Sequence, residues 1–214
     1  MANHRVVLWA VDLQSDFMHP KGKLYVPGAE NLLFNVRRLV RAAHEGKAFL
    51  VTHGCFHSKE DPEFAQFPQH CVRDTPGAEF IPDVLTGDPP RVRNHRDDRL
   101  PEDLSEHRQV LLEKQTLDIF ETRHADTLVD RLGREAQFFV FGVVTEYCVR
   151  LAAAGLLKRG RKVAIVTDAI ETLNPEEGKR TISELKSLGA ELLTTDEALK
   201  RIEAAPTTAV PVRG

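Results

Sequence analysis

The chain has 214 residues, of which 42% are hydrophobic and 29% charged, a composition typical of a soluble globular domain. A formal net charge of −3 gives no electrostatic basis for binding nucleic acid or a membrane surface. No apolar run approaches the roughly 20 residues that a membrane span needs, and residues 1–17 lack the organisation of a signal peptide. Three cysteines, none in a Cys-x-x-Cys pair, favour free thiols in a reducing cytoplasm. We therefore expect a cytoplasmic protein without a nucleic-acid or membrane partner.

The first part of the chain alternates between strand-like and helical patterns. The apolar run 5–12 predicts a buried strand, and the spacing of leucine and valine over 28–46 predicts a helix that Gly46 ends. Residues 47–53 predict the next strand. A long connection rich in proline and histidine then spans 54–108.

The alternation resumes after this connection. It predicts strand 109–114, a helix near 123–133, strand 136–142, a helix near 146–158, strand 162–168, helix 175–188, strand 190–195 and helix 196–204. Such alternation predicts a doubly wound α/β fold, with a mostly parallel six-stranded sheet and helices on both faces. We expect one domain over residues 1–204 and a C-terminal tail over 205–214.

Three chemically reactive side chains fall near the ends of predicted strands, where sites collect in sheets of this kind. Asp12 closes the first strand, Lys114 closes the third, and Cys148 follows the fourth in the first turn of a helix. Each has a purely structural alternative: a turn residue, a solvated strand end and a small core residue, respectively. Because all three lie on one edge of the predicted sheet, we favour a shared function.

The three residue types form a coherent chemistry. With Thr145 as the N-cap, Cys148 would take the third helical position, where free N–H groups and the helix dipole favour a thiolate. A lysine ammonium would lower the pKa of the thiol further, and an aspartate would take the proton as general base. Backbone N–H groups at the helix start could stabilise an oxyanion. This combination predicts acyl transfer through a thioester, followed by hydrolysis.

Four motifs carry a family resemblance. They are VDLQSDF (11–17), FPQHCVRDTPGAEF (67–80), EK (113–114) and GVVTEYCVR (142–150), and they resemble the successive motifs of the nicotinamidase and isochorismatase-like cysteine hydrolases. The resemblance implies an isochorismatase-like hydrolase domain that self-associates as a homodimer or larger homo-oligomer. It also implies a catalytic triad of Asp12, Lys114 and Cys148, a non-proline cis peptide at Val143–Val144, and an oxyanion hole from the amides of Val144 and Cys148.

The resemblance further implies an amidohydrolase that cleaves the C–N bond of a small-molecule amide. Phe17, Phe67 and Tyr147 fall at motif positions that line the substrate pocket of the family. Gln115, however, stands where a glycine often follows the lysine in nicotinamidases. Three functions therefore stay open: a nicotinamidase, a related hydrolase of another small amide, carbamoyl or ureido compound without metal, and a non-catalytic binding protein on the same fold.

A metal site is the last implication of the resemblance. Nicotinamidases of this family bind a divalent ion through Asp-x-His, a further His or Glu, and the histidine of a Pro-x-His-Cys motif. The corresponding places hold Cys55, His57, Glu63 and His70, with Cys55 in place of the aspartate. These four could bind zinc, but together they would close a tetrahedral site. We expect a decayed site with weak or no metal and poor activity on nicotinamide; a bound divalent metal such as zinc is the alternative.

Overall fold

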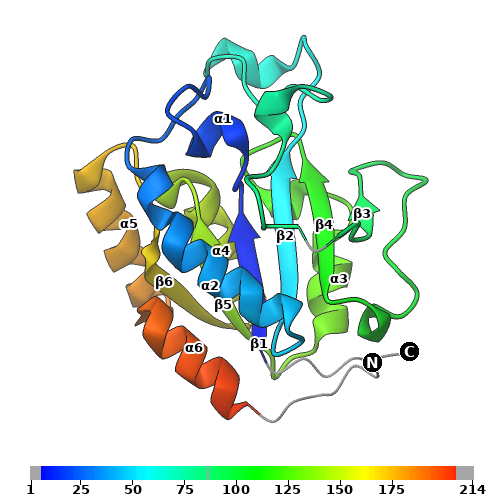
Figure 1. The fold of residues 1–214 in the computed structure, drawn as a ribbon, viewed down its shortest axis with the longest axis vertical. Coiled ribbons are helices and arrows are strands. Elements are labelled where there is room, and N and C mark those ends of the chain that lie inside the picture. Colours follow the sequence, from blue (N-terminus) through cyan, green and yellow to red (C-terminus); the bar gives the residue numbers. More distant parts are fainter. Residues whose placement is uncertain (1–5, 86, 206–214) are drawn as a thin grey trace.

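The computed structural model describes residues 6–85 and 87–205, which form one parallel seven-stranded sheet covered by helices (Figure 1). The strand order is β3-β4-β2-β1-β5-β6-β7, so the chain starts in the middle of the sheet and builds outward in both directions. This confirms the doubly wound α/β fold. The strands are β1 (Val6–Val11), β2 (Phe49–Cys55), β3 (Arg91–Val92), β4 (Gln109–Lys114), β5 (Gln137–Gly142), β6 (Lys162–Ile170) and β7 (Glu191–Leu193).

The sheet contains one strand more than the six that the sequence predicts. The additional strand, β3, lies inside the long connection predicted for 54–108 and pairs Arg91 with Leu111 and Val92 with Leu112. Two residues are too few to show an alternating pattern, so the sequence carried no signal for this edge strand. The central strands were predictable because helices bury both of their faces, which requires continuous apolar runs such as VVLWAV in β1.

Helices cover both faces of the sheet, as predicted (Figure 1). Helices α2 (Leu33–His44) and α6 (Thr195–Ala204) pack on one face, in one apolar cluster. Helices α3 (Ala125–Leu132), α4 (Arg150–Lys158) and α5 (Pro175–Ser187) pack on the other. Within the described residues, none of the helices has the length and apolar character needed to cross a membrane.

Short helical turns lie between these elements. They are α1 (Ser15–Met18), the 3-10 turns η1 (Ala29–Leu32), η2 (Pro62–Ala65), η3 (Pro76–Ala78), η4 (Leu104–Glu106) and η5 (Ile119–Glu121), and the π-turn η6 (Thr145–Val149). The turn α1 and much of the connection after β2 lie over the carboxyl ends of the central strands (Figure 1). The predicted C-terminal tail, 205–214, falls outside the described residues except for Ala205.

Gly142, the last residue of β5, permits a close approach to β1. Its φ angle is 117°, and a Cβ atom at this position would lie 2.1 Å from the backbone oxygen of Val11. Because Asp12 follows Val11 directly, the approach of these two strands also fixes the backbone at the carboxyl end of β1. Only glycine meets both requirements of backbone angle and space.

We predict that Gly142→Ala lowers the free energy of unfolding by about 2–4 kcal/mol, since it combines a backbone clash with a disfavoured angle. Gly160→Ala is the matched control, because Gly160 also has a positive φ of 69° but a Cβ atom there would meet no other atom within 4 Å. The control should lose only about 1 kcal/mol. Equal losses for the two variants in urea denaturation would contradict this account.

Candidate active site

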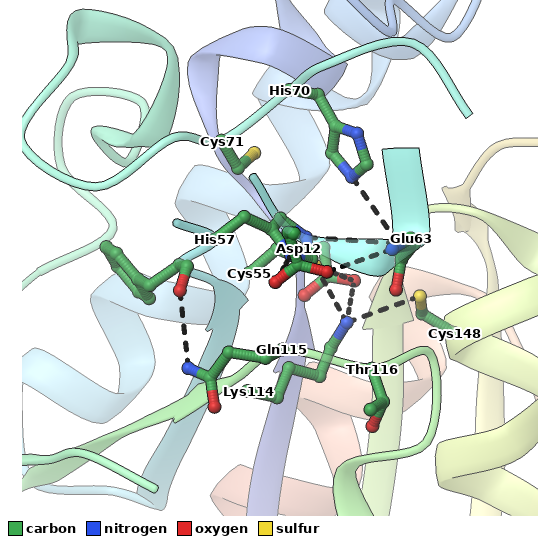
Figure 2. A network of polar contacts seen from close by, with 12 residues as sticks. Asp12, Cys55, His57, Glu63, His70, Cys71, Lys114, Gln115, Thr116 and Cys148 are labelled. Atoms are coloured by element: carbon green, nitrogen blue, oxygen red, sulfur yellow. Dashed lines mark hydrogen bonds and ion pairs between the residues drawn. The ribbon is translucent and has the colours of Figure 1, made fainter. Parts of the chain in front are cut away.

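The three predicted reactive residues meet at the carboxyl edge of the sheet (Figure 2). Asp12 follows β1, Lys114 ends β4, and Cys148 lies in the π-turn after β5. Their exposed fractions are 1%, 0% and 5%. The Lys114 Nζ atom lies 3.0 Å from Asp12 Oδ2 and 3.5 Å from Cys148 Sγ. The fold thus gathers these side chains from three distant parts of the sequence around one buried ammonium group.

The turn that carries Cys148 differs from the predicted helix start. Thr145 is not the N-cap: the preceding Val144 takes that position without a side-chain capping bond, and a single π-turn comes before α4. The Thr145 hydroxyl instead donates to the carbonyl of Glu171, which ties the turn to the end of β6. Turns of this kind are frequent at functional sites, but side-chain periodicity does not reveal them in a sequence.

The backbone before this turn has the cis peptide bond that the family resemblance implied, between Val143 and Val144. The Val143 N–H donates to the carbonyl of Val11, which joins the segment to β1. Across the described ranges, by contrast, the Val144 N–H donates to no protein acceptor. A free amide therefore lies four residues before the Cys148 thiol.

A second thiol belongs to the same cluster. Lys114 Nζ donates to Cys55 Sγ at 2.9 Å, and this sulfur lies 3.9 Å from Asp12 Oδ2 (Figure 2). The sequence assigned Cys55 only to the metal site. Its place at the end of β2, between β1 and β4 in the sheet, makes it a neighbour of the ammonium group as well.

Charge interactions in this cluster oppose the effect of burial. Burial alone would raise the pKa of Asp12, but the Lys114 ammonium and His53 hold that pKa well below its usual range. Burial alone would lower the pKa of Lys114, yet the Asp12 carboxylate and the two sulfur atoms raise it well above its usual range. The two groups therefore form a buried ion pair, since each favours the charged state of the other.

The candidate nucleophile, Cys148, has a thiol whose pKa is shifted by this buried cluster. Burial first, and then the Asp12 carboxylate, raise the pKa of Cys148 well above that of an ordinary thiol, and Lys114 only partly offsets them. The sequence predicted the opposite shift, because the helix start and the lysine suggested a stabilised thiolate. It could not weigh the desolvation of a fully buried sulfur. Attack by this thiol would consequently need a base, and the Asp12 carboxylate, which contacts the same Lys114 ammonium group as the sulfur, is the candidate.

The predicted metal ligands also converge. Three buried residues, Cys55, His57 and His70, each offer one potential ligand atom, and these atoms all lie within 4.8 Å of one another. Glu63 Oε1 lies 3.8 Å from Nε2 of His57 and 3.7 Å from Nε2 of His70 (Figure 2). Within the described residues neither ring nitrogen of His57 makes a hydrogen bond, although Nδ1 lies 3.1 Å from Asp61. Buried imidazole nitrogens without hydrogen bonds, beside a thiol, fit a zinc ion.

A buried carboxylate on β4 stabilises the segment that carries these ligands. Glu113 accepts hydrogen bonds from Arg73 and Arg91, and both guanidinium groups lie over the ring of Phe56, 5.5 Å and 4.4 Å from its centre. Arg73 follows His70 by three residues, and Glu113 directly precedes Lys114. The Arg73–Glu113 contact therefore links the candidate metal ligands to the strand that carries Lys114. Glu113 belongs to the EK motif (113–114), but the sequence alone assigned a role only to Lys114.

Each of the three predicted pocket aromatics makes a ring contact with another residue that the sequence assigned to the site. Phe17 is buried, and its ring meets that of His70 edge-on at 5.2 Å between centres. Phe67 and Tyr147, both half-buried, contact each other at 5.9 Å with perpendicular rings. Phe64, which the sequence analysis did not single out, packs against His57 and His70 at 5.3 and 5.7 Å.

The doubly wound sheet, with a buried aspartate, lysine and cysteine at its carboxyl edge, fits the isochorismatase-like hydrolases. The family model described as "Isochorismatase domain" matches residues 6–96 and 86–197. The chain belongs to this family, as its motifs indicated.

Named relatives agree with this assignment. The nicotinamidase of Escherichia coli K12 is 26% identical over 211 residues, which covers 87% of this chain and 93% of that protein. A pyrazinamidase of Pyrococcus horikoshii, solved in complex with zinc, is 31% identical with a TM-score of 0.70 and covers 89% of this chain and 99% of its own. An N-carbamoylsarcosine amidase of Thermoplasma acidophilum shares the fold at 22% identity, with a TM-score of 0.70 over 90% of this chain and 98% of its own.

Proposed function

We propose that this protein hydrolyses the C–N bond of a small-molecule amide through a thioester on Cys148. The observation that carries the proposal is the contact of one buried ammonium group, Lys114, with both a carboxylate and the Cys148 sulfur. Nucleophile, base and cation are the groups that such a reaction requires. The nicotinamidase and pyrazinamidase relatives support the same class of reaction.

The proposed reaction follows from the protonation states of the cluster. As the Cys148 sulfur attacks the carbonyl carbon, its proton passes to Asp12 and a C–S bond forms. The carbonyl oxygen becomes an oxyanion, for which the amides of Val144 and Cys148 are the proposed donors. The C–N bond then breaks, and the leaving amine takes the proton from Asp12. Asp12 next deprotonates a water molecule, whose oxygen attacks the thioester carbon. The C–S bond then breaks, the carboxylic acid leaves, and the Cys148 sulfur takes back its proton from Asp12.

Lys114 has an electrostatic role in this scheme. While Asp12 is ionised, the ammonium group stabilises the carboxylate, and during attack it lies 3.5 Å from the sulfur that loses a proton. Because the site is buried, these interactions are stronger than they would be in water. The lysine therefore stabilises negative charge on whichever neighbour carries it, without itself releasing a proton.

A heteroaromatic carboxamide such as nicotinamide is the substrate class that the site supports best. Phe17, Phe67 and Tyr147 would enclose a planar ring. A second candidate is a small carbamoyl or ureido compound, because Gln115 stands where a glycine often follows the lysine in nicotinamidases. A non-catalytic binding protein would not need a thiol and a carboxylate in contact with one buried ammonium group.

Cys55, His57 and His70, with Glu63 next to the two histidines, are the residues that would hold a zinc ion. The sequence favoured a decayed site because a cysteine replaces the expected aspartate. The convergence of three buried donor atoms supports a retained site instead, and a thiolate ligand favours zinc over magnesium or manganese. With Cys55, His57 and His70 as its protein ligands and Glu63 outside that set, a bound zinc ion would keep an open position and would supply a Lewis acid that orients the substrate.

The remaining expectations concern location and assembly. All three cysteines are free and buried, which supports a cytoplasmic protein. We also expect a homodimer or larger homo-oligomer, on the strength of the family resemblance. The expected partner is a small-molecule amide, with no nucleic-acid or membrane partner.

Ammonia release from a panel of small amides, led by nicotinamide and pyrazinamide, tests the proposed function. We predict that Cys148→Ala abolishes release, and that Asp12→Asn lowers kcat by at least about a thousandfold, because the two side chains act as a unit. Cys71→Ser is the matched control: among the described residues the sulfur of this buried cysteine makes only a long contact, with the carbonyl of Gly77, so the variant should keep the activity. Ordinary turnover by Cys148→Ala would exclude the thioester mechanism.

Metal analysis of protein purified without a histidine tag tests the zinc site. We predict close to one zinc ion per chain, lost in His57→Ala and in His70→Ala but kept in His19→Ala, since His19 is exposed. Cobalt substitution should give a thiolate-to-metal charge-transfer band that Cys55→Ser removes. Metal-free wild-type protein that also fails to bind added zinc or cobalt would support the decayed site that the sequence favoured.

A further inference from the structure

His53 is a buried histidine beside the proposed base that the reaction scheme does not use. Its exposed fraction is 0%, and its Nδ1 atom lies 3.4 Å from Asp12 Oδ1. Within the described part of the chain, neither the His53 ring nitrogens nor Asp12 Oδ1 make a hydrogen bond. Two buried polar groups that lack partners therefore face each other, at a distance that a small rotation of the ring would turn into a hydrogen bond.

Strand pairing and the ring of Trp9 hold His53 next to Asp12. Strand β1 pairs with β2 so that Val11 lies opposite His53, and the backbone N–H of Asp12 donates to the carbonyl of His53 at 3.0 Å. On its other side the imidazole meets the ring of Trp9 edge-on, 6.0 Å between centres. The backbone ladder and the indole together leave the imidazole little freedom, so its ring remains next to the carboxylate.

The two oxygen atoms of Asp12 have different partners. Oδ2 faces the Lys114 ammonium at 3.0 Å and the Cys55 sulfur at 3.9 Å, whereas Oδ1 faces the His53 imidazole at 3.4 Å. When Asp12 takes the thiol proton it becomes neutral, and its attraction to Lys114 weakens at that moment. A hydrogen bond to Oδ1 persists in both charge states, because a carboxyl group accepts at that oxygen whether or not it is ionised.

We propose that His53 is a positioning residue, whose Nδ1–H donates to Asp12 Oδ1 and keeps the carboxyl group aimed at the thiol throughout the proton transfers. This inference rests on the proposed function of Asp12 as the base. The contact is long, at 3.4 Å, and catalytic hydrogen bonds commonly shorten when a substrate binds. A histidine serves here because its ring can carry the Nδ1 proton in its neutral form as well as in its charged form.

Three substitutions separate a positioning role from packing. The side-chain nitrogen of His53→Asn can take the place of Nδ1, that of His53→Gln takes the place of Nε2, and His53→Leu has none. We expect His53→Leu and His53→Gln to lower kcat about 10- to 100-fold with KM unchanged, the effect of losing a hydrogen bond to a charged group. His53→Asn should restore kcat to within a few-fold of wild type. Equal kcat in His53→Leu and wild type, or better rescue by Gln than by Asn, would overturn the proposal.

Two measurements need no substrate, so they remain informative if the proposed hydrolysis fails. The rate of Cys148 alkylation by iodoacetamide, with the modified residue identified by mass spectrometry, should fall in His53→Leu and recover in His53→Asn. Long-range proton–nitrogen NMR of the wild-type protein should show the His53 hydrogen on Nδ1. A hydrogen on Nε2 alone would overturn the proposal even if every variant failed to fold. Wild type that hydrolyses no amide, with the alkylation pattern intact, would refute the proposed function and leave the role of His53 standing.

Discussion

The ion pair between Lys114 and Asp12 is the interaction on which the rest of the site depends. An ammonium group with no exposed surface is strongly destabilised unless a carboxylate lies next to it, and here the separation is 3.0 Å. If either Lys114 or Asp12 moved away, the other would remain as a buried charge without a counter-ion. The ends of β1 and β4 are therefore held in a fixed relation across the intervening β2. This constraint also brings both thiols into contact with the same ammonium group.

The chemistry follows from how this pair distributes charge. Because the carboxylate is strongly stabilised as an anion and the thiol is disfavoured as one, the proton rests on sulfur before the reaction begins. In the proposed mechanism, Asp12 is ionised at rest and serves as the base in both the acylation and the hydrolysis steps. Cys55 contacts Lys114 and also lies beside His57 and His70. The proposed reaction centre and the candidate zinc site therefore have one residue in common.

The sequence predicted the features that local patterns encode. Apolar runs marked the central strands, and motif spacing marked Asp12, Lys114 and Cys148, which the fold brings together. It did not predict β3, because two residues show no period, or the π-turn, because its side chains follow a helical pattern. It gave the wrong direction for the thiol pKa, since desolvation depends on the whole fold. The sequence did not indicate a role for His53, because its position beside Asp12 depends on the register of β1 against β2.

The most direct test of the central claim is to trap the covalent intermediate on the nucleophile. Wild-type protein would be mixed rapidly with an amide that it hydrolyses, quenched in acid within the first turnovers and measured by intact-protein and peptide mass spectrometry. The account predicts a mass gain equal to the acyl group of that amide, located on Cys148 and removed by hydroxylamine, as expected of a thioester. Steady ammonia release with an acyl group found on Cys55 instead, or with no adduct at any quench time under conditions where hydrolysis limits turnover, would contradict it.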